Sequence, residues 1–136
     1  MNAALPADLH EIIYVSTLAD DAPALVVADI ANQARICNRR AEITGLLVFD
    51  GMHFCQQLEG CPARIAAAIE RIGKDPRHHH LTVVHAGPLA QRRFRRFSLG
   101  YTSVEDTELL VRLGQLQGPK ALQAFTSLLC ELDLDS

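Results

Sequence analysis

The stretch that most constrains the fold of this chain is residues 43–60, ITGLLVFDGMHFCQQLEG. A first apolar run ends at the pair Asp50-Gly51, and a second run begins at His53. Asp-Gly readily takes up the positive φ angles that a two-residue hairpin turn requires. The pattern therefore predicts two antiparallel strands joined by a tight turn.

One side chain in the second strand of this hairpin is unexpected. Gln56 lies between Phe54 and Leu58, and residues two apart point to the same face of a strand. If that face is buried, a carboxamide is buried with it, and its carbonyl and two N–H groups need partners. We therefore expect polar groups beneath the hairpin, either from the protein or from a ligand.

Composition fits one soluble domain. The chain has 136 residues, of which 49% are hydrophobic, and a formal net charge of −3. No apolar run approaches the roughly 18 residues of a membrane span, and the first residues lack the pattern of a signal peptide. The four cysteines form no C-x-x-C pair, which favours reduced thiols over disulfides or zinc. We therefore expect a cytoplasmic protein.

Helix and strand signals predict the order β-α-β-β-α-β-β followed by two helices. Beside the hairpin, strands are expected at 10–17, 81–86 and 97–101, and helices at 24–39, 62–73, 105–113 and 119–132. Asp21 could cap the first helix, and Pro62 suits the first turn of the second. The order is typical of a ferredoxin-like α+β fold, a mixed sheet with two helices on one face. We divide the chain into a domain, 1–104, and a C-terminal helical segment, 105–136.

Three polar side chains converge in this predicted fold. The first and third strands are central neighbours, so Tyr14 approaches Gln56, and Asn38 at the end of the first helix lies over the same face. A phenol and two amides around one cavity suit a flat heterocycle with both donors and acceptors. The alternative is an internal network of these side chains with water.

A charged group follows the second predicted helix. Arg71, Asp75 and Arg77 could hold a phosphate or polyol tail, since arginine forms bidentate hydrogen bonds and a carboxylate accepts from hydroxyls. The alternative is an ordinary solvated helix end, where cations are favoured in any case.

Two further motifs invite other functions. Residues 78–80 are three histidines, but consecutive residues on an extended segment alternate faces, so we expect surface histidines and no metal site.

The second motif is the arginine-rich segment 91–97, QRRFRRF, which could bind RNA. The negative net charge and 5% aromatic content argue against nucleic acid, which leaves a solvated loop or a partner-facing patch. The four arginines of this motif are Arg92, Arg93, Arg95 and Arg96.

Taken together, these motifs resemble the BLUF domain, a family of blue-light sensors that use FAD. The resemblance extends over roughly residues 9–104, in order and without large gaps. Each motif is weak alone, but the set is specific at this spacing. The motifs are IIYVS (12–16), ARICN (34–38), ITGLL (43–47), FCQQLEG (54–60), RIGKDPRHH (71–79) and RRFRRFSLGY (92–101).

The resemblance implies a flavin held between the first two helices. FAD is the usual ligand of the family, and FMN or riboflavin could satisfy the same ring contacts. Tyr14 matches the photoactive tyrosine, Gln56 the switching glutamine, and Asn38 the asparagine that bonds the pyrimidine edge of the flavin. Ser16 matches a small polar residue near that tyrosine. The residues that match the lining of the ribityl and phosphate part are Arg71, Asp75 and Arg77.

The resemblance also implies a mechanism. On illumination an electron and then a proton leave Tyr14, and the proton passes through Gln56. The glutamine returns reoriented or tautomerised, donates a stronger hydrogen bond to the flavin C4 carbonyl, and the absorption shifts to the red. Nothing is consumed, so this is a sensor and not an enzyme. The signal is expected to pass through the fifth strand and the C-terminal helices to a separate signalling protein. The many leucines of these helices suit a cap on the far face of the sheet and part of a dimer or partner interface.

The chain departs from the family at three positions. Phe97 stands where many members have tryptophan, Leu99 where they have methionine, and Cys37 where a polar residue often contacts the ring. The first two changes affect the route and lifetime of the output rather than the photochemistry. The competing interpretation is a light-independent ferredoxin-like module that binds a ligand or a protein. A small-molecule enzyme is disfavoured because no acid–base pair stands out.

Overall fold

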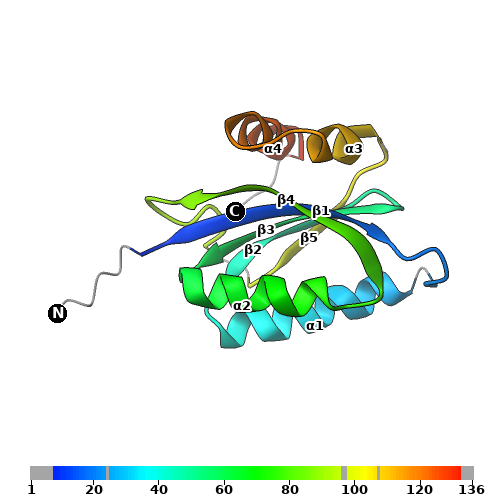
Figure 1. Ribbon diagram of the computed structural model, residues 1–136, viewed down its shortest axis with the longest axis horizontal. Helices are drawn as coiled ribbons and strands as arrows, with labels where there is room; N and C mark the ends of the chain where they lie inside the picture. The colour runs from blue at the N-terminus through cyan, green and yellow to red at the C-terminus, as the bar shows by residue number, and fades with distance from the viewer. Residues whose placement is uncertain (1–7, 24, 96–97, 107, 133–136) are drawn as a thin grey trace.

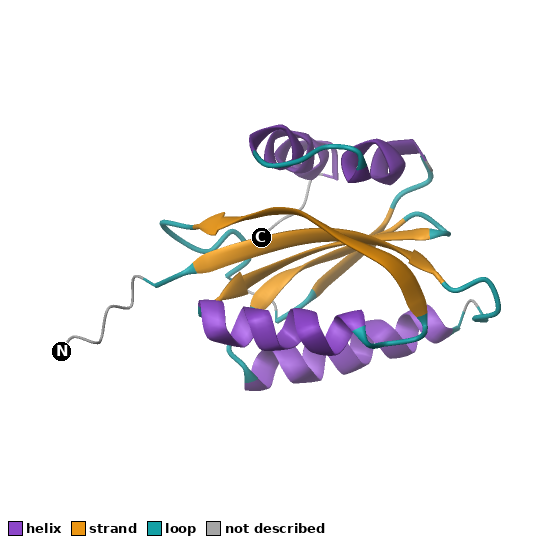
Figure 2. Ribbon diagram, viewed as in Figure 1, coloured by secondary structure: helices purple, strands orange, loops and turns teal. Residues whose placement is uncertain are grey.

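The structure is a computed structural model that describes residues 8–23, 25–95, 98–106 and 108–132. A five-stranded mixed sheet forms the middle layer, with helices α1 and α2 on one face and α3 and α4 on the other (Figure 1). Figure 2 shows the same three layers coloured by secondary structure. Within the described part of the chain, no helix has the length and apolar character needed to cross a membrane.

The elements follow the expected order, and the ferredoxin-like α+β class is confirmed. The strands lie in the order β4-β1-β3-β2-β5, so β1 and β3 are neighbours as expected. Only β5 runs parallel to its neighbour, β2, among the described strand pairs. The bounds are β1 His10–Leu18, α1 Val26–Arg40, β2 Thr44–Phe49, β3 His53–Gly60, α2 Pro62–Gly73, β4 His78–Pro88, β5 Gly100–Ser103, α3 Glu108–Gly114 and α4 Pro119–Leu132.

Two helix starts test the capping predictions. Pro62 is in the first turn of α2, as expected. The cap assigned to Asp21 is wrong, because the N-cap of α1 is Leu25 and no side chain bonds there. Asp21 belongs instead to an earlier turn, in which the amide of Ala22 bonds the carbonyl of Ala19.

Two strands differ from the sequence-based bounds. β4 begins at His78, three residues earlier than expected, because β1 extends far enough to pair Leu18 with His78. Because of this long-range pairing, His78, the first of the three histidines, is part of the sheet. β5 begins at Gly100, and Phe97 lies outside the described residues. Leu99, just before β5, is buried against α1 in a cluster that includes Phe54.

Strand β3 is buried on both faces, because helices cover both sides of the sheet. Every residue from Phe54 to Gly60 is buried. Gln56 lines a space shared with Ile30 of α1 and Ile72 of α2. Because side chains alternate along a strand, Gln57 faces the α3–α4 layer. Both amides are therefore withdrawn from solvent, and each must find its partners inside the protein or in a ligand.

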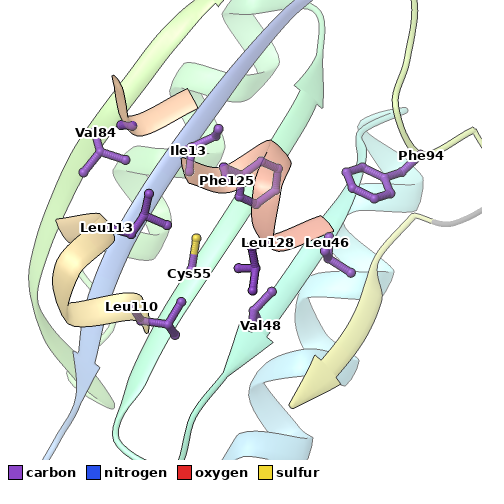
Figure 3. Close-up of a cluster of buried hydrophobic side chains, with 11 residues drawn as sticks. Ile13, Leu46, Val48, Cys55, Val84, Phe94, Leu110, Leu113, Phe125 and Leu128 are labelled. Carbon is purple, nitrogen blue, oxygen red and sulfur yellow. The ribbon is translucent and has the colours of Figure 1, made fainter. Parts of the chain in front are cut away.

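The main apolar core fills the space between the sheet and the α3–α4 layer (Figure 3). The C-terminal helices therefore cover the far face of the sheet. Cys55 lies in this core, and burial raises the pKa of its thiol to about 12, so it stays protonated at neutral pH. The buried members are Ile13, Leu46, Val48, Cys55, Val84, Phe94, Leu110, Leu113, Ala121, Phe125 and Leu128.

We expect Gly45→Ala to destabilise the sheet. A Cβ at Gly45 would overlap the backbone carbonyl of Gln57 on the neighbouring strand, and neither backbone can move without breaking the pairing of β2 with β3. Overpacking of this kind costs about 1–3 kcal/mol. Urea unfolding followed by circular dichroism would measure the loss. Gly73→Ala is the matched control, because no atom lies within 4 Å of the added Cβ, and equal stability of the two variants would contradict the prediction.

Candidate functional site

The site is built on a pair of opposed residues in the two central strands. Tyr14 of β1 and Gln56 of β3 are direct partners in the antiparallel register. Their exposed fractions are 3% and 2%. The Tyr14 hydroxyl donates a hydrogen bond to Oε1 of Gln56. The structure thus confirms that these two side chains meet on the α1–α2 face.

The amide nitrogen of Gln56 has no hydrogen-bond partner in the described part of the chain. Because Oε1 accepts from Tyr14, Nε2 is the free end, and it is buried without a hydrogen bond among the described residues. A buried polar group left unpaired costs about 1–3 kcal/mol. Native proteins keep few such groups, and each calls for an explanation. Two N–H donors are therefore available to an acceptor in the space next to Gln56.

That space is a pocket between the sheet and the two helices α1 and α2. Its walls combine apolar side chains, such as Ile30 and Leu47, with the buried Tyr14–Gln56 pair and charged groups nearer the surface. Largely apolar walls with a few convergent polar groups are typical of cofactor sites. The lining residues are Tyr14, Ile30, Gln33, Ala34, Cys37, Leu47, Phe54, Gln56, Arg71, Ile72, Asp75, Arg77 and His78.

The charged group at the pocket contains one tight ion pair and one further arginine. Nη2 of Arg77 lies 2.6 Å from Oδ2 of Asp75, and also 2.8 Å from Oε1 of Gln33. Hydrogen bonds from Arg77 hold the pKa of Asp75 below its ordinary value, so this carboxyl is ionised at neutral pH. Because Asp75 neutralises Arg77, the exposed Arg71 is the cation best placed to attract a negatively charged tail.

His78 lines the pocket, so the prediction of a surface histidine is wrong at this position. Its Nε2 lies 2.8 Å from the carbonyl oxygen of Ile72, which can only accept, so Nε2 carries the hydrogen. In the neutral ring Nδ1 then accepts from the Ser16 hydroxyl, 2.8 Å away. The ring centroid is 6.5 Å from that of Tyr14. His78 thus ties β1, α2 and β4 together beside the tyrosine, whereas His79 and His80 are exposed as expected.

Asn38 lies next to the pocket but does not line it. Its side chain is buried, and Nδ2 donates to the carbonyl of Ser98 at 2.9 Å. The preceding residue, Cys37, forms part of the wall. The structure therefore brings Tyr14 and Gln56 together with the charged group, and leaves the role of Asn38 a prediction. Ser16 sits behind His78 rather than on the pocket surface.

Two of the arginines in the 91–97 motif are used inside the protein. Arg92 donates to Thr44 and to the backbone carbonyl of Glu42, and Arg93 pairs with Glu11. Arg96 lies outside the described residues.

Among the residues that the structure describes, no three His, Cys, Asp or Glu side chains are grouped so as to hold a metal ion.

The fold and the pocket define a small α+β domain with a buried Tyr–Gln pair facing a pocket between the sheet and α1 and α2. The sequence model of one family, BLUF, described as sensors of blue-light using FAD, matches residues 9–100. This match covers more than half of the chain, and the chain belongs to the BLUF family of flavin-binding blue-light photoreceptors. The family's cofactor, FAD, agrees with the expectation from the sequence.

Curated relatives carry the same region within longer proteins. The blue light- and temperature-regulated antirepressor BluF of Escherichia coli K12 is 33% identical over 86 residues, which are 63% of this chain and 21% of the relative. The photoactivated adenylate cyclase subunit alpha of Euglena gracilis is 25% identical over 100 residues, 72% of this chain and 10% of the relative. The chain thus spans about a fifth or less of these proteins.

Solved structures share the fold. The dark-state structure of BlrB, a BLUF protein, has a TM-score of 0.73 at 28% identity and covers 88% of this chain and 93% of its own. Klebsiella pneumoniae BlrP1 with FMN and cyclic diGMP has a TM-score of 0.66 at 29% identity, over 70% of this chain and 26% of its own. The photo-activated state of BlsA, at 24% identity, has a TM-score of 0.74 over 86% of this chain and 91% of its own.

Stability should fall at alkaline pH because of Tyr14. Burial raises the pKa of its hydroxyl well above the ordinary value of 10.0. Above pH 10 the unfolded chain therefore releases a proton that the folded chain keeps, and the free energy of unfolding falls by up to about 1.4 kcal/mol per pH unit. Urea unfolding should be measured between pH 9 and 11, about one unit either side of the ordinary pKa. The free energy of unfolding should fall less over this range in Tyr14→Phe than in the unmodified protein.

Tyr101→Phe is the control for this titration. Tyr101 is 43% exposed, so its removal should change the alkaline loss less than removal of Tyr14. An alkaline loss in Tyr14→Phe as steep as that of the unmodified protein would contradict the prediction.

Proposed function

We propose that this chain senses blue light through a flavin bound non-covalently against Tyr14 and Gln56, and that it passes the resulting change to a separate signalling protein. The observation that carries the proposal is the buried, unpaired Nε2 of Gln56 beside the Tyr14 hydrogen bond. A donor fixed in this way is directed at an acceptor that the described protein residues do not supply.

The lining of the pocket fits a flavin. The ring is flat and apolar on its faces, and its edge offers carbonyl and ring-nitrogen acceptors to the N–H groups of Gln56. The apolar walls include Ile30 and Leu47, which suit the ring faces. We propose that Asn38 would bond the pyrimidine edge of the flavin. Arg71, together with Asp75 and Arg77, would contact the ribityl and phosphate part of the cofactor. FAD, FMN and riboflavin share the ring that Gln56 would contact.

The flavin, when bound, absorbs blue light and supplies the acceptor for one electron. Tyr14 would give up that electron, and its hydroxyl proton would follow along the existing hydrogen bond to Oε1 of Gln56 and through that amide to the flavin. Burial raises the pKa of Tyr14, so the hydroxyl stays protonated until the electron has left. When the electron and proton return, Tyr14 is restored and nothing is consumed.

Gln56 is the element that retains the change. A carboxamide carries an acceptor and a donor on one rotatable group, so it supports two hydrogen-bond arrangements of similar energy. In the dark arrangement Oε1 accepts from Tyr14. In the light arrangement the rotated or tautomerised amide would donate more strongly toward the C4 carbonyl of a bound flavin, and the absorption would shift to the red.

The output is proposed to leave through β5 and the α3–α4 layer. Leu99 packs with Phe54 and Leu47, both of which line the pocket. Leu47 is also paired with Tyr101 of β5. We propose that the α3–α4 layer forms a homodimer or partner interface, that the protein acts in the cytoplasm, and that the domain itself has no enzymatic turnover. Phe97 and Leu99 would set the lifetime of the signal.

Gln56→Leu tests the switching role. The variant keeps the volume of the side chain and removes both hydrogen-bonding ends, so it should still bind flavin and be yellow. Blue light should no longer produce the reversible red shift, because Tyr14 has lost its proton acceptor. Absorption spectra before and after illumination measure this. Gln123→Leu, on the exposed face of α4, is the control, and a normal red shift in Gln56→Leu would refute the assignment.

Arg71→Ala tests the assignment of the tail. Loss of an exposed cation should weaken binding of FMN by about three- to tenfold, the size of a screened charge-assisted hydrogen bond. Riboflavin, which has no phosphate, should bind as before. Titration of flavin-depleted protein with each compound, followed by flavin fluorescence, gives the two dissociation constants. Arg112→Ala on α3 is the control, and an equal loss for riboflavin and FMN would show that Arg71 does not contact the phosphate.

A further inference from the structure

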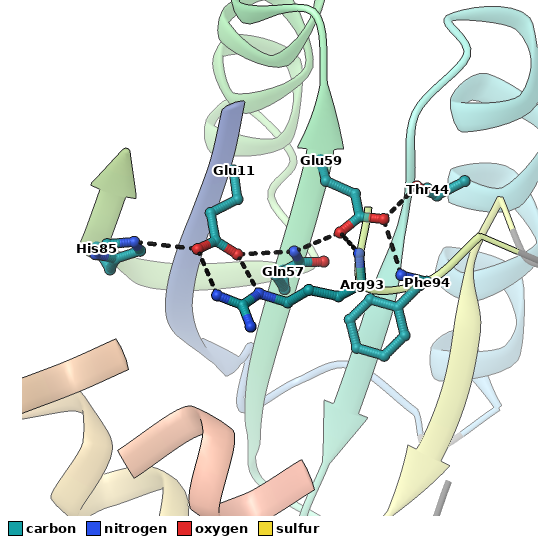
Figure 4. Close-up of polar contacts among 7 residues, drawn as sticks. All are labelled: Glu11, Thr44, Gln57, Glu59, His85, Arg93 and Phe94. Carbon is teal, nitrogen blue, oxygen red and sulfur yellow. Dashed lines mark hydrogen bonds and ion pairs between the residues drawn. The ribbon is translucent and has the colours of Figure 1, made fainter. Parts of the chain in front are cut away.

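A second polar cluster lies around Gln57 (Figure 4), on the face of the sheet opposite the pocket that Gln56 lines. We call Glu11, Gln57, Glu59 and Arg93 the carboxylate cluster. Glu11 is on β1, the next two on β3, and Arg93 in the segment after β4. The BLUF photochemistry described above uses none of these residues. Figure 4 shows their side chains directed toward one another across the strands.

Gln57 is clamped between two carboxylates. Its Nε2 donates to Oε1 of Glu11 at 3.0 Å and to Oε1 of Glu59 at 2.9 Å. The amide therefore uses both N–H groups and cannot turn without losing a charge-assisted hydrogen bond. Its Oε1 is buried and unpaired among the described residues. Gln56 shows the opposite arrangement: its oxygen accepts a hydrogen bond and its nitrogen has no partner among the residues described.

Glu59 anchors the chain that leads from β4 to β5. Its exposed fraction is 0%, and its carboxylate accepts four hydrogen bonds. Two of these come from the backbone amides of Arg93, at 3.0 Å, and Phe94, at 2.9 Å. The others come from Gln57 and from Thr44 of β2. One side chain on β3 thus fixes the position of two successive peptide groups beyond β4.

Glu11, on β1, completes the carboxylate cluster by bonding Gln57 and Arg93. Burial alone would raise its pKa, but hydrogen bonds from Arg93 and Gln57 outweigh burial and hold the pKa below the ordinary value. Nε and Nη2 of Arg93 lie 2.8 and 3.0 Å from the carboxylate oxygens. His85 lies 3.2 Å from the same carboxylate. The segment after β4 is therefore held by its side chain and by its backbone.

The carboxylate cluster begins one residue away from the photoswitch. Gln56 and Gln57 share a peptide bond and point to opposite faces of β3. Beyond the cluster, Phe94 joins the apolar core that contains Phe125 and Leu128 of α4. A continuous set of contacts thus runs from Gln56 through Gln57 and Glu59 to the backbone of residues 93–94, and from there to the α3–α4 layer.

We propose that the carboxylate cluster is the device that transmits the rearrangement of Gln56 across the sheet. This inference rests on the proposed function, since it takes the change at Gln56 as its input. A shift of β3 that accompanies the new arrangement of Gln56 displaces Gln57 and Glu59. The backbone amides of Arg93 and Phe94 follow the Glu59 carboxylate, and Phe94 carries the displacement into the packing of α4.

The carboxylate cluster buries more polar groups than are needed to hold the segment after β4 in place. Two buried carboxylates with one guanidinium contribute little net stability compared with apolar side chains of similar volume, and the unpaired Gln57 Oε1 is a further cost. A network in which every member constrains the next, however, responds to a shift of one member as a unit. Such a response fits a two-state element, which is what transmission between two sites requires.

Proton–nitrogen correlation NMR on the flavin-loaded full chain, in the dark and under blue light, tests the proposal. The resonances to follow are the side-chain amide of Gln57, the backbone amides of Arg93 and Phe94, and those of α4. Absorption is recorded on the same samples. We expect the red shift to be accompanied by changes at Gln57, Arg93 and Phe94, and at α4 residues such as Phe125.

Two variants interrupt the cluster. Arg93→Lys keeps the charge and removes the fork that binds Glu11, and Thr44→Val removes one of the four bonds to Glu59. In both, the red shift should persist while the light-induced changes at α4 fall by about fivefold or more, as expected when a coupling of 1–3 kcal/mol is lost. Arg95→Lys is the matched control, because the side chain of Arg95 bonds only Gln91 among the described residues.

The outcomes are distinct. A red shift with unchanged resonances at Gln57, Arg93 and Phe94 would overturn the proposal and leave the photoreceptor function intact. So would α4 changes of full size in both variants. Absence of a red shift in the unmodified protein would instead refute the proposed function, and the inference with it. If a variant fails to bind flavin, the light response of the Gln57, Arg93 and Phe94 resonances in the unmodified protein still tests the proposal.

Discussion

The hydrogen bond from Tyr14 to Gln56 is the interaction on which the proposed function of this protein depends. It fixes which end of the Gln56 amide faces the tyrosine, and it leaves the nitrogen end buried and unpaired among the described residues. In the proposed function, this single contact would provide the path for a proton and direct a donor toward the pocket. The pairing of β1 with β3 places the two residues opposite each other, so the sheet itself sets the geometry of the switch.

Burial of β3 on both faces makes the two neighbouring glutamines complementary. Among the described residues Gln56 has one partner and one unpaired end, which suits the change of arrangement that we propose for its amide. Gln57 has two charged partners, so its amide is held. A strand that carries a variable amide on one face and a clamped amide on the other is suited to convert a change in hydrogen bonding into a displacement of the backbone.

Sequence alone predicted the element order, the hairpin and the meeting of Tyr14 with Gln56, because strand alternation and turn chemistry are local. It also predicted that the C-terminal helices cap the far face of the sheet. It could not predict the carboxylate cluster, because local patterns do not show that side chains of β1, β3 and the segment after β4 meet there. His78 was missed for a related reason: only pairing with β1 extends β4 back to that residue. The cap assigned to Asp21 was wrong because the chain makes a separate turn before α1 begins.

The most direct test of the central claim is the absorption spectrum of the purified protein in the dark, after blue light, and again after a dark interval. A flavin spectrum that shifts to the red on illumination and returns in the dark is the predicted result, because Gln56 alternates between two hydrogen-bond arrangements. A protein that stays colourless after incubation with FAD, or one whose flavin spectrum does not move with light, would contradict the account.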